Sequence, residues 1–387
     1  MPRIRTGKVH VGLAARDVSA SLPADRPVRE PVTARALYCA GGEAAAVWVV
    51  LDFLDFGPDF VDALKGAVRA RTGLADEHVH VVTTHNHSVL SAARVDLDVL
   101  CTGAAGAAEA ARDRARPAVM RSASVNVAER LNYKRRLFVP ELEGTVTFWY
   151  GITPAQGYRA DRLVRQVVRA LVSDRRIIYA DSGYAEPVAE EAFIEDALRR
   201  DPDSYVMPPG DSTLQAVLFE DERGEAIGSL ARYAVHVHAC KHGGPYGSDF
   251  PHYVRQELEN AFGGCSIFLN GPCANISYVT GLGAGPDERT CGGLLGSRAA
   301  AALTAARPKP LTAFTDATRE VTLPIRDDFH IEDGDREREV GRVRCLLDPP
   351  NLGLAERKRL AERLFWLGQT ATMRDVWRCV DRRDGVL

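Results

Sequence analysis

Six of the ten histidines in this chain of 387 residues fall in two short windows. The first window holds His85 and His87, and the second runs from His236 through His238 and His242 to His252. Neutral imidazole is the commonest metal ligand in proteins, and a zinc site requires three or four nitrogen, oxygen or sulfur atoms that converge on one point. The two windows therefore indicate a metal centre, with Zn²⁺ as the expected ion and other divalent ions as alternatives.

Each window contains an H-x-H pair. Residues two apart on an extended strand share a face, so His85 and His87 could point into one cleft, and so could His236 and His238. The alternative for any single histidine is a surface position or a hydrogen-bonded place in the core, which is the commoner case. His78 and His80 have the same spacing, and we expect them only to lie on an edge or face of their strand without binding a metal.

Acidic side chains provide further candidates. Asp52 follows an apolar run and would lie where a parallel strand delivers catalytic residues, although an acid there is as often part of a loop. Asp55 follows the same run. Asp249 is a candidate catalytic residue, with the alternative that it is only the N-cap of the next helix, a position that aspartate favours. Asn270 and Asn275, on either side of a loop, are weaker candidates.

The basic run Lys134, Arg135 and Arg136 could hold a carboxylate or phosphate, because guanidinium groups bind both in a bidentate manner. The alternative is a solvated loop. A serine nucleophile has no support, since no G-x-S-x-G motif surrounds Ser88. The eight cysteines form no C-x-x-C pair, and we expect them to be free thiols.

The first histidine window follows a predicted βαβ unit. The apolar run 44–53 indicates a buried strand, 60–73 has helical spacing of its apolar residues, and 78–84 indicates a second strand. A helical crossover makes the two strands parallel, and ligands bind beyond the carboxyl ends of such strands. Residues 85–87 lie at that end, where a metal centre is expected.

The remaining segments complete an α/β fold with a mixed or parallel sheet flanked by helices, and no internal repeat is visible in the sequence. A hairpin is predicted over 214–239, a helix from 248 or 249 to 262, and a strand over 265–271. Further helices are predicted over 104–116, 161–173, 191–200, 293–306, 353–366 and 370–380. We expect a catalytic domain at 1–310 and a charged, mainly helical C-terminal segment at 311–387.

The amino-acid composition limits the class of protein, its binding partners and its cellular compartment. Hydrophobic residues make up 45% and charged residues 26% of the chain, as in ordinary globular proteins. The net charge of −3 combines interspersed acids and bases, so we expect neither nucleic-acid nor membrane binding. No apolar run approaches the roughly 18 residues of a transmembrane helix, and no signal peptide is evident. A cytoplasmic protein is expected, and the Ala- and Arg-rich composition indicates a bacterial one.

Five blocks of the sequence carry a resemblance: VGLAARDVSASLP (11–23), VVLDFLDFG (49–57), HVHVVTTHNHSVLS (78–91), ARYAVHVHACKHGGPYGSDFPHYVRQELENAFGG (231–264) and FLNGPCANIS (268–277). Taken together and in this order, they resemble the neutral, non-lysosomal ceramidase family and its short bacterial relatives. The resemblance covers about residues 1–310, and NYKRR at 132–136 is similar to an N-R-R loop of the family.

The resemblance implies a function and residue roles. The family hydrolyses the amide bond of N-acyl sphingoid lipids with one zinc ion, which lowers the pKa of its bound water and polarises the acyl carbonyl. His85 and His236 match zinc ligands of the family. His87 matches a residue that supports catalysis or contacts the substrate, and Arg135 or Arg136 matches an arginine that contacts the substrate.

This chain departs from the family pattern in places that bear on the ligand set. Asn275 stands where the family has an acid, and we expect the chain to end before the segment that supplies a glutamate and a tyrosine ligand. A third ligand must then come from nearby or from a second subunit, with the second source slightly preferred. The local substitutes are His238, which we assign to the metal, and Cys240, His242, Asp249 and His252.

Three functions follow from these observations. The leading prediction is a zinc-dependent amidohydrolase-like enzyme that cleaves an amide or ester bond of a small or medium-sized molecule. The first alternative is one subunit of a two-chain metalloenzyme, or a homo-oligomer, in which a partner completes the ligand set. The second is a metal-free descendant that serves in binding or structure.

Overall fold

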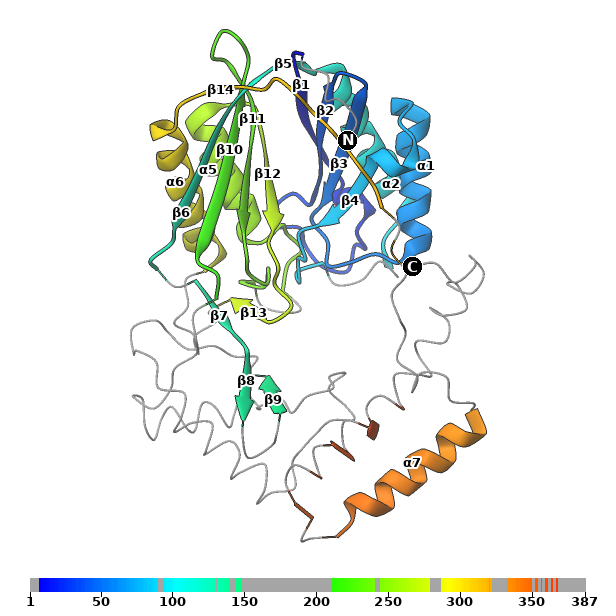
Figure 1. Ribbon diagram of the computed structural model, residues 1–387. Coiled ribbons are helices and arrows are strands. Elements are labelled where there is room, and N and C mark those ends of the chain that lie inside the picture. The colour runs from blue at the N-terminus through cyan, green and yellow to red at the C-terminus, as the bar shows by residue number, and fades with distance from the viewer. Residues whose placement is uncertain are drawn as a thin grey trace. The chain divides into compact units, whose positions relative to one another are not determined.

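The structure is a computed structural model (Figure 1). It divides by internal contacts into two compact units, of which the first combines Met1–Tyr133, Pro209–Thr280 and Ala284–Thr318. The second combines Lys134–Pro208, Gly281–Gly283 and Arg319–Leu387. The described residues are 7–89, 94–129, 131–139, 144–147, 210–240, 244–278, 287–319, 321, 333–349 and scattered positions between 352 and 367. The helices predicted over 161–173, 191–200 and 370–380 lie outside them.

The first unit begins with a five-stranded sheet in the order β4-β3-β2-β1-β5. Neighbouring strands are antiparallel except β3 and β4, which are parallel. The strands are β1 (His10–Asp17), β2 (Thr33–Gly41), β3 (Ala44–Leu51), β4 (Val79–Thr83) and β5 (Arg116–Pro117).

The predicted βαβ unit is confirmed. Helix α1 (Pro58–Thr72) begins with a proline, whose fixed φ suits a first helical turn, and ends at Gly73 with a φ of 75°. It connects β3 to the parallel strand β4. The 3₁₀ turns Ser19–Ser21 and Asp76–His78 complete the connections of this part of the chain.

A second five-stranded sheet has the order β12-β11-β10-β6-β14. Neighbouring strands within this sheet are also antiparallel, apart from the parallel pair β11 and β12. The turn between β10 and β11 contains Gly224, whose φ of 82° lies in the region that glycine adopts without steric cost. The strands are β6 (Val119–Asn126), β10 (Thr213–Glu220), β11 (Ala226–Tyr233), β12 (Cys265–Asn270) and β14 (Lys309–Pro310).

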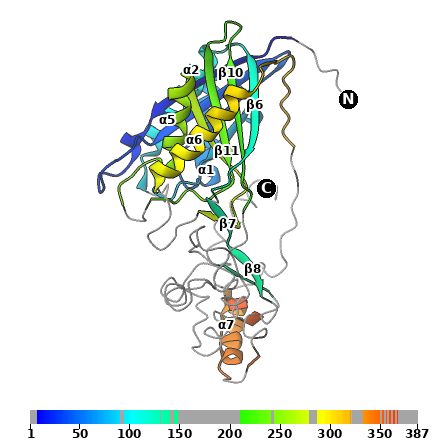
Figure 2. The same cartoon turned by 90° about the vertical axis from the view of Figure 1, so that its left-hand side faces the viewer.

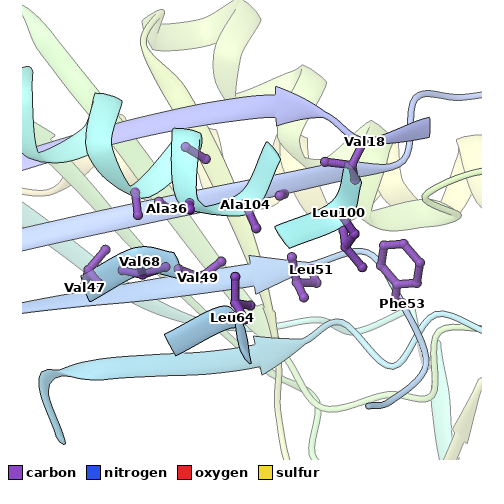
Figure 3. Close-up of a cluster of buried hydrophobic side chains, with 14 of the residues drawn as sticks. Val18, Ala36, Val47, Val49, Leu51, Phe53, Leu64, Val68, Leu100 and Ala104 are labelled. Carbon is purple, nitrogen blue, oxygen red and sulfur yellow. The ribbon is translucent and has the colours of Figure 1, made fainter. Parts of the chain in front are cut away.

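Helices cover the outer faces of both sheets, so the described part of the first unit has four layers (Figures 1 and 2). Helices α1 and α2 (Leu97–Asp113) pack on the first sheet through the core cluster drawn in Figure 3, which includes Val49, Leu64 and Ala104. Helices α5 (Phe250–Phe262) and α6 (Glu288–Ala305) cover the second sheet. A third cluster lies between the sheets. The α/β class with mixed sheets flanked by helices is confirmed.

Three elements show the largest differences from the predicted boundaries, and for the two helices the cause is an aspartate cap. Strand β11 ends at Tyr233 rather than near 239, so His236 and His238 lie in a loop. Helix α2 begins at Leu97 rather than 104 because the Asp96 side chain accepts a hydrogen bond from Val99 N and caps it. Helix α6 begins at Glu288 rather than 293 because Asp287 caps it in the same way.

The two sheets repeat one topology. The first half, β1-β2-β3-α1-β4-α2-β5, has the same element order and the same strand pairings as the second half, β6-β10-β11-α5-β12-α6-β14. The second half contains two insertions, one between β6 and β10 and the other, with strand β13 (Ile276–Tyr278), between β12 and α6. The sequence does not reveal this repeat, because the pattern that recurs is the order of elements rather than particular residues.

Fewer elements are described in and around the second unit. Strand β7 (Asn132–Lys134) crosses the boundary, and β8 (Arg136–Val139) pairs antiparallel with β9 (Gly144–Thr147). Helix α7 (Asp333–Leu347) was not predicted as an element, but it agrees with the expectation of a helical C-terminal segment. Within the predicted helix 353–366, Glu356 is helical. None of the described helices is both long and apolar enough to cross a membrane.

Candidate metal centre

Three histidines from the two windows converge in the first unit. His85, His87 and His236 each offer a ring nitrogen, and these three atoms lie within 4.8 Å of one another. The ring centroids are 4.7 Å apart for His85 and His236, 4.9 Å for His85 and His87, and 5.5 Å for His87 and His236. Two nitrogens on one tetrahedral zinc ion are roughly 3.4 Å apart, given bonds of 2.0–2.1 Å. Small side-chain rotations therefore suffice for all three to share an ion.

His85 is held in an unusual backbone conformation just beyond the end of β4. Thr84 N donates to Leu51 O at 3.0 Å and Asn86 N donates to Phe53 O at 3.0 Å, so the chain on both sides of His85 stays bonded to the continuation of β3. Between these two anchors His85 has a φ of 59°, in the left-handed region. Few residues other than glycine adopt this conformation without compensation from their surroundings. The histidine pair is thus placed by a tight irregular loop rather than by a straight strand.

Hydrogen bonding of His236 fixes which ring nitrogen is available. Its Nδ1 lies 2.7 Å from the Ile276 carbonyl oxygen, and its ring is buried. Because a carbonyl only accepts, Nδ1 must carry the proton, which leaves the Nε2 lone pair for a metal ion. Metal-bound histidines in proteins usually make such a hydrogen bond through the other ring nitrogen. The donor set and its support therefore fit a divalent metal ion.

Backbone contacts bring the two windows together. His87 N donates to Val237 O at 2.9 Å, and Asn86 and Val237 form an isolated parallel bridge. The loop after β4 and the loop after β11 therefore run parallel to each other at this point. The convergence of the histidines is therefore built into the main chain as well as into side-chain packing.

His238 lies beside the three converging histidines. Its ring centroid is 5.7 Å from that of His87, 5.8 Å from that of His236 and 6.2 Å from that of Tyr278. Burial raises the pKa of Tyr278 above its usual value, so this neighbour is a neutral phenol. Among the described residues, the group close enough to share one ion contains His85, His87 and His236, and His238 borders it.

Asp249 caps helix α5, which was the alternative to the catalytic role predicted for it. Its Oδ1 accepts from Phe250 N at 2.5 Å and its Oδ2 accepts from Cys240 N at 2.9 Å. The residue is fully buried, and burial raises the pKa of its carboxyl group. Both carboxylate oxygens are engaged by backbone amides that start the helix and hold the segment after His238.

Asp52 is the centre of a buried polar network. Arg255 Nη1 donates to Asp52 Oδ1 at 2.7 Å and Arg255 Nη2 to Oδ2 at 3.0 Å, and Thr33 Oγ1 and Ser248 Oγ also donate to Oδ2. Burial alone would raise the pKa of Asp52, but Arg255 and Thr33 outweigh it and hold the pKa below its usual value. Asp55, by contrast, is exposed. The network ties the end of β3 to α5.

The two arginines and the histidine pair His78 and His80 remain to be placed among the predicted residues. Arg135 and Arg136 belong to the second unit, and their contact with substrate stays a prediction. His78 and His80 both contact Asp316, through Nδ1 at 2.8 Å and Nε2 at 3.0 Å. Residues that the sequence did not single out are Asn86, between the two histidines of the first window, and Ile276, whose carbonyl orients His236. An asparagine inside the H-x-H motif could have drawn attention to Asn86. Ile276 acts through its backbone carbonyl, which no sequence pattern reveals.

Comparison with solved structures finds neutral ceramidases. The structure described as a ceramidase complexed with C2 gives a TM-score of 0.51 at 14% identity, over 77% of this chain and 44% of that chain. The neutral ceramidase from Pseudomonas aeruginosa gives a TM-score of 0.50 at 15% identity, over the same shares of the two chains. The fold expected from the resemblance is confirmed, and this chain spans less than half the length of the ceramidases it matches. No protein-family model and no curated sequence matches the chain.

Proposed function

We propose that this protein is a zinc-dependent hydrolase that cleaves an amide or ester bond of a small or medium-sized substrate. The observation that carries the proposal is the convergence of His85, His87 and His236 within 4.8 Å on a ceramidase-like fold. Zinc bound there would supply a water of lowered pKa and an electrophile for the acyl carbonyl. A bacterial cytoplasm, as the composition indicates, is part of the same proposal.

The geometry supports a ligand set that differs in part from the sequence-based assignment. His87 is proposed as the third ligand, because its ring nitrogen lies within 4.8 Å of the ring nitrogens of both His85 and His236. His238 is proposed as a neighbouring group that contacts the substrate, since its ring borders those of His87 and His236. Catalytic zinc sites usually have three protein ligands, so this set needs no residue from a second subunit.

His236 is proposed to be the most rigid ligand. Its Nδ1–H donates to Ile276 O at 2.7 Å, and this bond fixes both the ring orientation and the tautomer. Water is largely excluded from this ring, because the residue is only 4% exposed. Electrostatic interactions at such a position are stronger than at the surface, which favours charge stabilisation during acyl transfer.

The test combines metal content with hydrolysis by the purified chain. Wild-type protein should hold one zinc per chain and hydrolyse members of a panel of N-acyl amines and acyl esters, with activity lost to a chelator and restored by Zn²⁺. Alanine at His85, His87 or His236 should abolish both properties. His80→Ala is the matched control, because His80 belongs to an H-x-H pair that contacts Asp316 instead.

The outcomes separate the competing functions. Weak zinc binding by the wild type that becomes tight only with a second protein would support the two-chain alternative. Absence of bound metal at any zinc concentration, with the fold intact, would support a metal-free descendant and overturn the proposal.

A further inference from the structure

The side chain of Asn86 is completely buried between the two histidines of the first window, and each of its polar atoms is used. Its Nδ2 donates to Asp52 O at 3.0 Å and to Gly247 O at 2.7 Å, and its Oδ1 accepts from Ser88 N at 3.0 Å. The two carbonyls require a donor and the Ser88 amide requires an acceptor. The orientation of the Asn86 amide is therefore determined by its partners.

The partners of Asn86 connect three parts of the first unit. Asp52 follows β3 and is itself anchored by Arg255. Gly247 precedes helix α5, whereas Ser88 belongs to the histidine loop itself. The backbone of Asn86 also bonds to Phe53 and bridges to the second histidine window. One side chain thus joins the loops after β3 and β4 to the segment that leads into α5.

Both neighbours of Asn86 in the chain are candidate metal ligands, so its anchoring acts on them directly. His85 has its φ of 59° one peptide before this anchor. Such a conformation persists in a residue with a Cβ only where the surroundings hold it in place. His87 follows the anchor, with its amide bonded to Val237 O at 2.9 Å.

We propose that Asn86 is the positioning residue of the metal centre, whose side-chain amide fixes the left-handed turn at His85 and thereby presents His85 and His87 before any metal binds. This inference rests on the proposed function in one respect, that the three histidines are the metal ligands. A ligand set arranged in advance binds its ion more tightly, because less order is imposed on binding.

An amide is the group that this position requires. Aspartate has nearly the same shape, but its carboxylate would place an oxygen against the Asp52 and Gly247 carbonyls and would donate to neither. Alanine removes all three side-chain hydrogen bonds without adding a charge. Serine keeps one small donor. The series Asn86→Ser, Asn86→Ala and Asn86→Asp therefore removes the anchor in steps.

The experiment uses the full-length chain and three measurements. Zinc affinity is measured by chelator competition, the visible spectrum is recorded with Co²⁺ in place of zinc, and histidine ring signals are recorded by NMR in the metal-free protein. Leu303→Ala is the control, because Leu303 is fully buried near the end of α6 and its truncation lowers stability without touching the histidine loops.

Asn86→Ala should weaken zinc binding by at least about tenfold, as expected when support behind a ligand is lost. It should also change the Co²⁺ spectrum and shift the ring signals of His85 and His87, and Asn86→Ser should do the same to a smaller degree. Leu303→Ala should leave all three measurements at wild-type values despite a lower melting temperature.

Wild-type affinity, Co²⁺ spectrum and ring signals in a folded Asn86→Ala or Asn86→Ser protein would overturn the inference. If Asn86→Asp fails to fold, these two milder variants decide. If the wild type binds neither ion, the proposed function fails, whereas the ring signals of the metal-free protein still decide whether Asn86 positions the histidines.

Discussion

The two halves of the first unit share one topology but end in different chemistry. In both, the residue after the parallel edge strand donates its amide to the last residue of the neighbouring strand, Thr84 to Leu51 and Gly271 to Tyr233, each at 3.0 Å. Counting from these matching hydrogen bonds, His85 corresponds to Pro272. The first half therefore contributes two histidines from the loop after its parallel edge strand, where the second half contributes none.

The loops that follow the hairpin strands show the opposite distribution. Counting from Leu51 and Tyr233, Leu54 corresponds to His236 and Asp52 corresponds to Ala234. The second half thus contributes its metal-ligand candidate from the loop after β11, whereas near the matching position the first half has Asp52, which forms a buried ion pair with Arg255 of α5. In both halves, loops follow the ends of two neighbouring parallel strands. The residues in these loops differ between the halves, and this difference determines which positions hold metal-ligand candidates and which hold buried polar residues.

Removal of the ion pair should have the largest effect on stability. Asp52→Ala leaves Arg255 buried without its partner, and both side chains are at most 2% exposed. The free energy of unfolding should fall by about 3–5 kcal/mol, measured by urea denaturation. Glu129→Ala, which removes a partly exposed pair with Arg298, should cost less than about 1 kcal/mol. Equal losses in the two variants would show that the first half does not depend on this pair.

Each half contains a glycine that lets a helix and a neighbouring element approach closely. A Cβ on Gly12 of β1 would lie 2.0 Å from Ala111 O of α2, whereas a Cβ on Gly292 of α6 would lie 2.4 Å from Phe250 O of α5. The close approach is strand to helix in the first half and helix to helix in the second. Gly12→Ala and Gly292→Ala should each lower the free energy of unfolding by about 1–3 kcal/mol.

Gly66 of α1 provides a control of opposite sign for these two substitutions. A Cβ there meets nothing within 4 Å, and the residue lies inside a helix. Gly66→Ala should therefore stabilise the protein by about 0.5–1 kcal/mol. Thermal unfolding of the three variants checks the contrast, and a stabilising Gly12→Ala would mean that β1 and α2 have room to separate.

The smallest expected effect concerns the segment that follows β14 and crosses from the second half to the first. Gly7 N donates to Thr312 O at 2.8 Å, Phe314 packs against Trp48, and Asp316 contacts His78 and His80. Burial would raise the pKa of Asp316, but hydrogen bonds from His78 and His80 outweigh it and lower the pKa.

Because the folded-state pKa of Asp316 lies below the unfolded value of about 3.9, its carboxylate stabilises the fold above that pH. This contribution should be lost as the pH falls below about 4. Asp316→Asn should lower stability slightly at pH 7 and flatten the decline in acid, as followed by urea denaturation at several pH values. An unchanged acid profile would place the acid sensitivity in other carboxylates, such as Asp52.

Much of the fold follows from local sequence patterns. The run 44–53, the helix that ends at Gly73 and the strand before His85 were predictable because each has its own periodicity and termination signal. The early starts of α2 and α6 were missed, although Asp96 and Asp287 are suitable caps. Polar residues such as Thr102 and Thr290 interrupt the apolar pattern within the helical residues that were missed.

The candidate site was partly predictable for a similar reason. The clustering of histidines is visible in the sequence, but which of them converge depends on the end of β11 at Tyr233 and on the turn at His85. Both are set by contacts between distant segments, such as that of Asn86 with Gly247. No local pattern encodes such contacts. Strand alternation therefore predicted that His238 would face the metal centre as readily as His236.

The most direct test of the metal centre is a crystal structure of the protein with zinc, with anomalous diffraction recorded on both sides of the zinc absorption edge. The predicted result is a single strong anomalous peak about 2.0–2.1 Å from ring nitrogens of His85, His87 and His236, with Nε2 as the donor atom of His236. A peak bound instead by His78 and His80, or no peak in crystals soaked with excess zinc, would contradict the account.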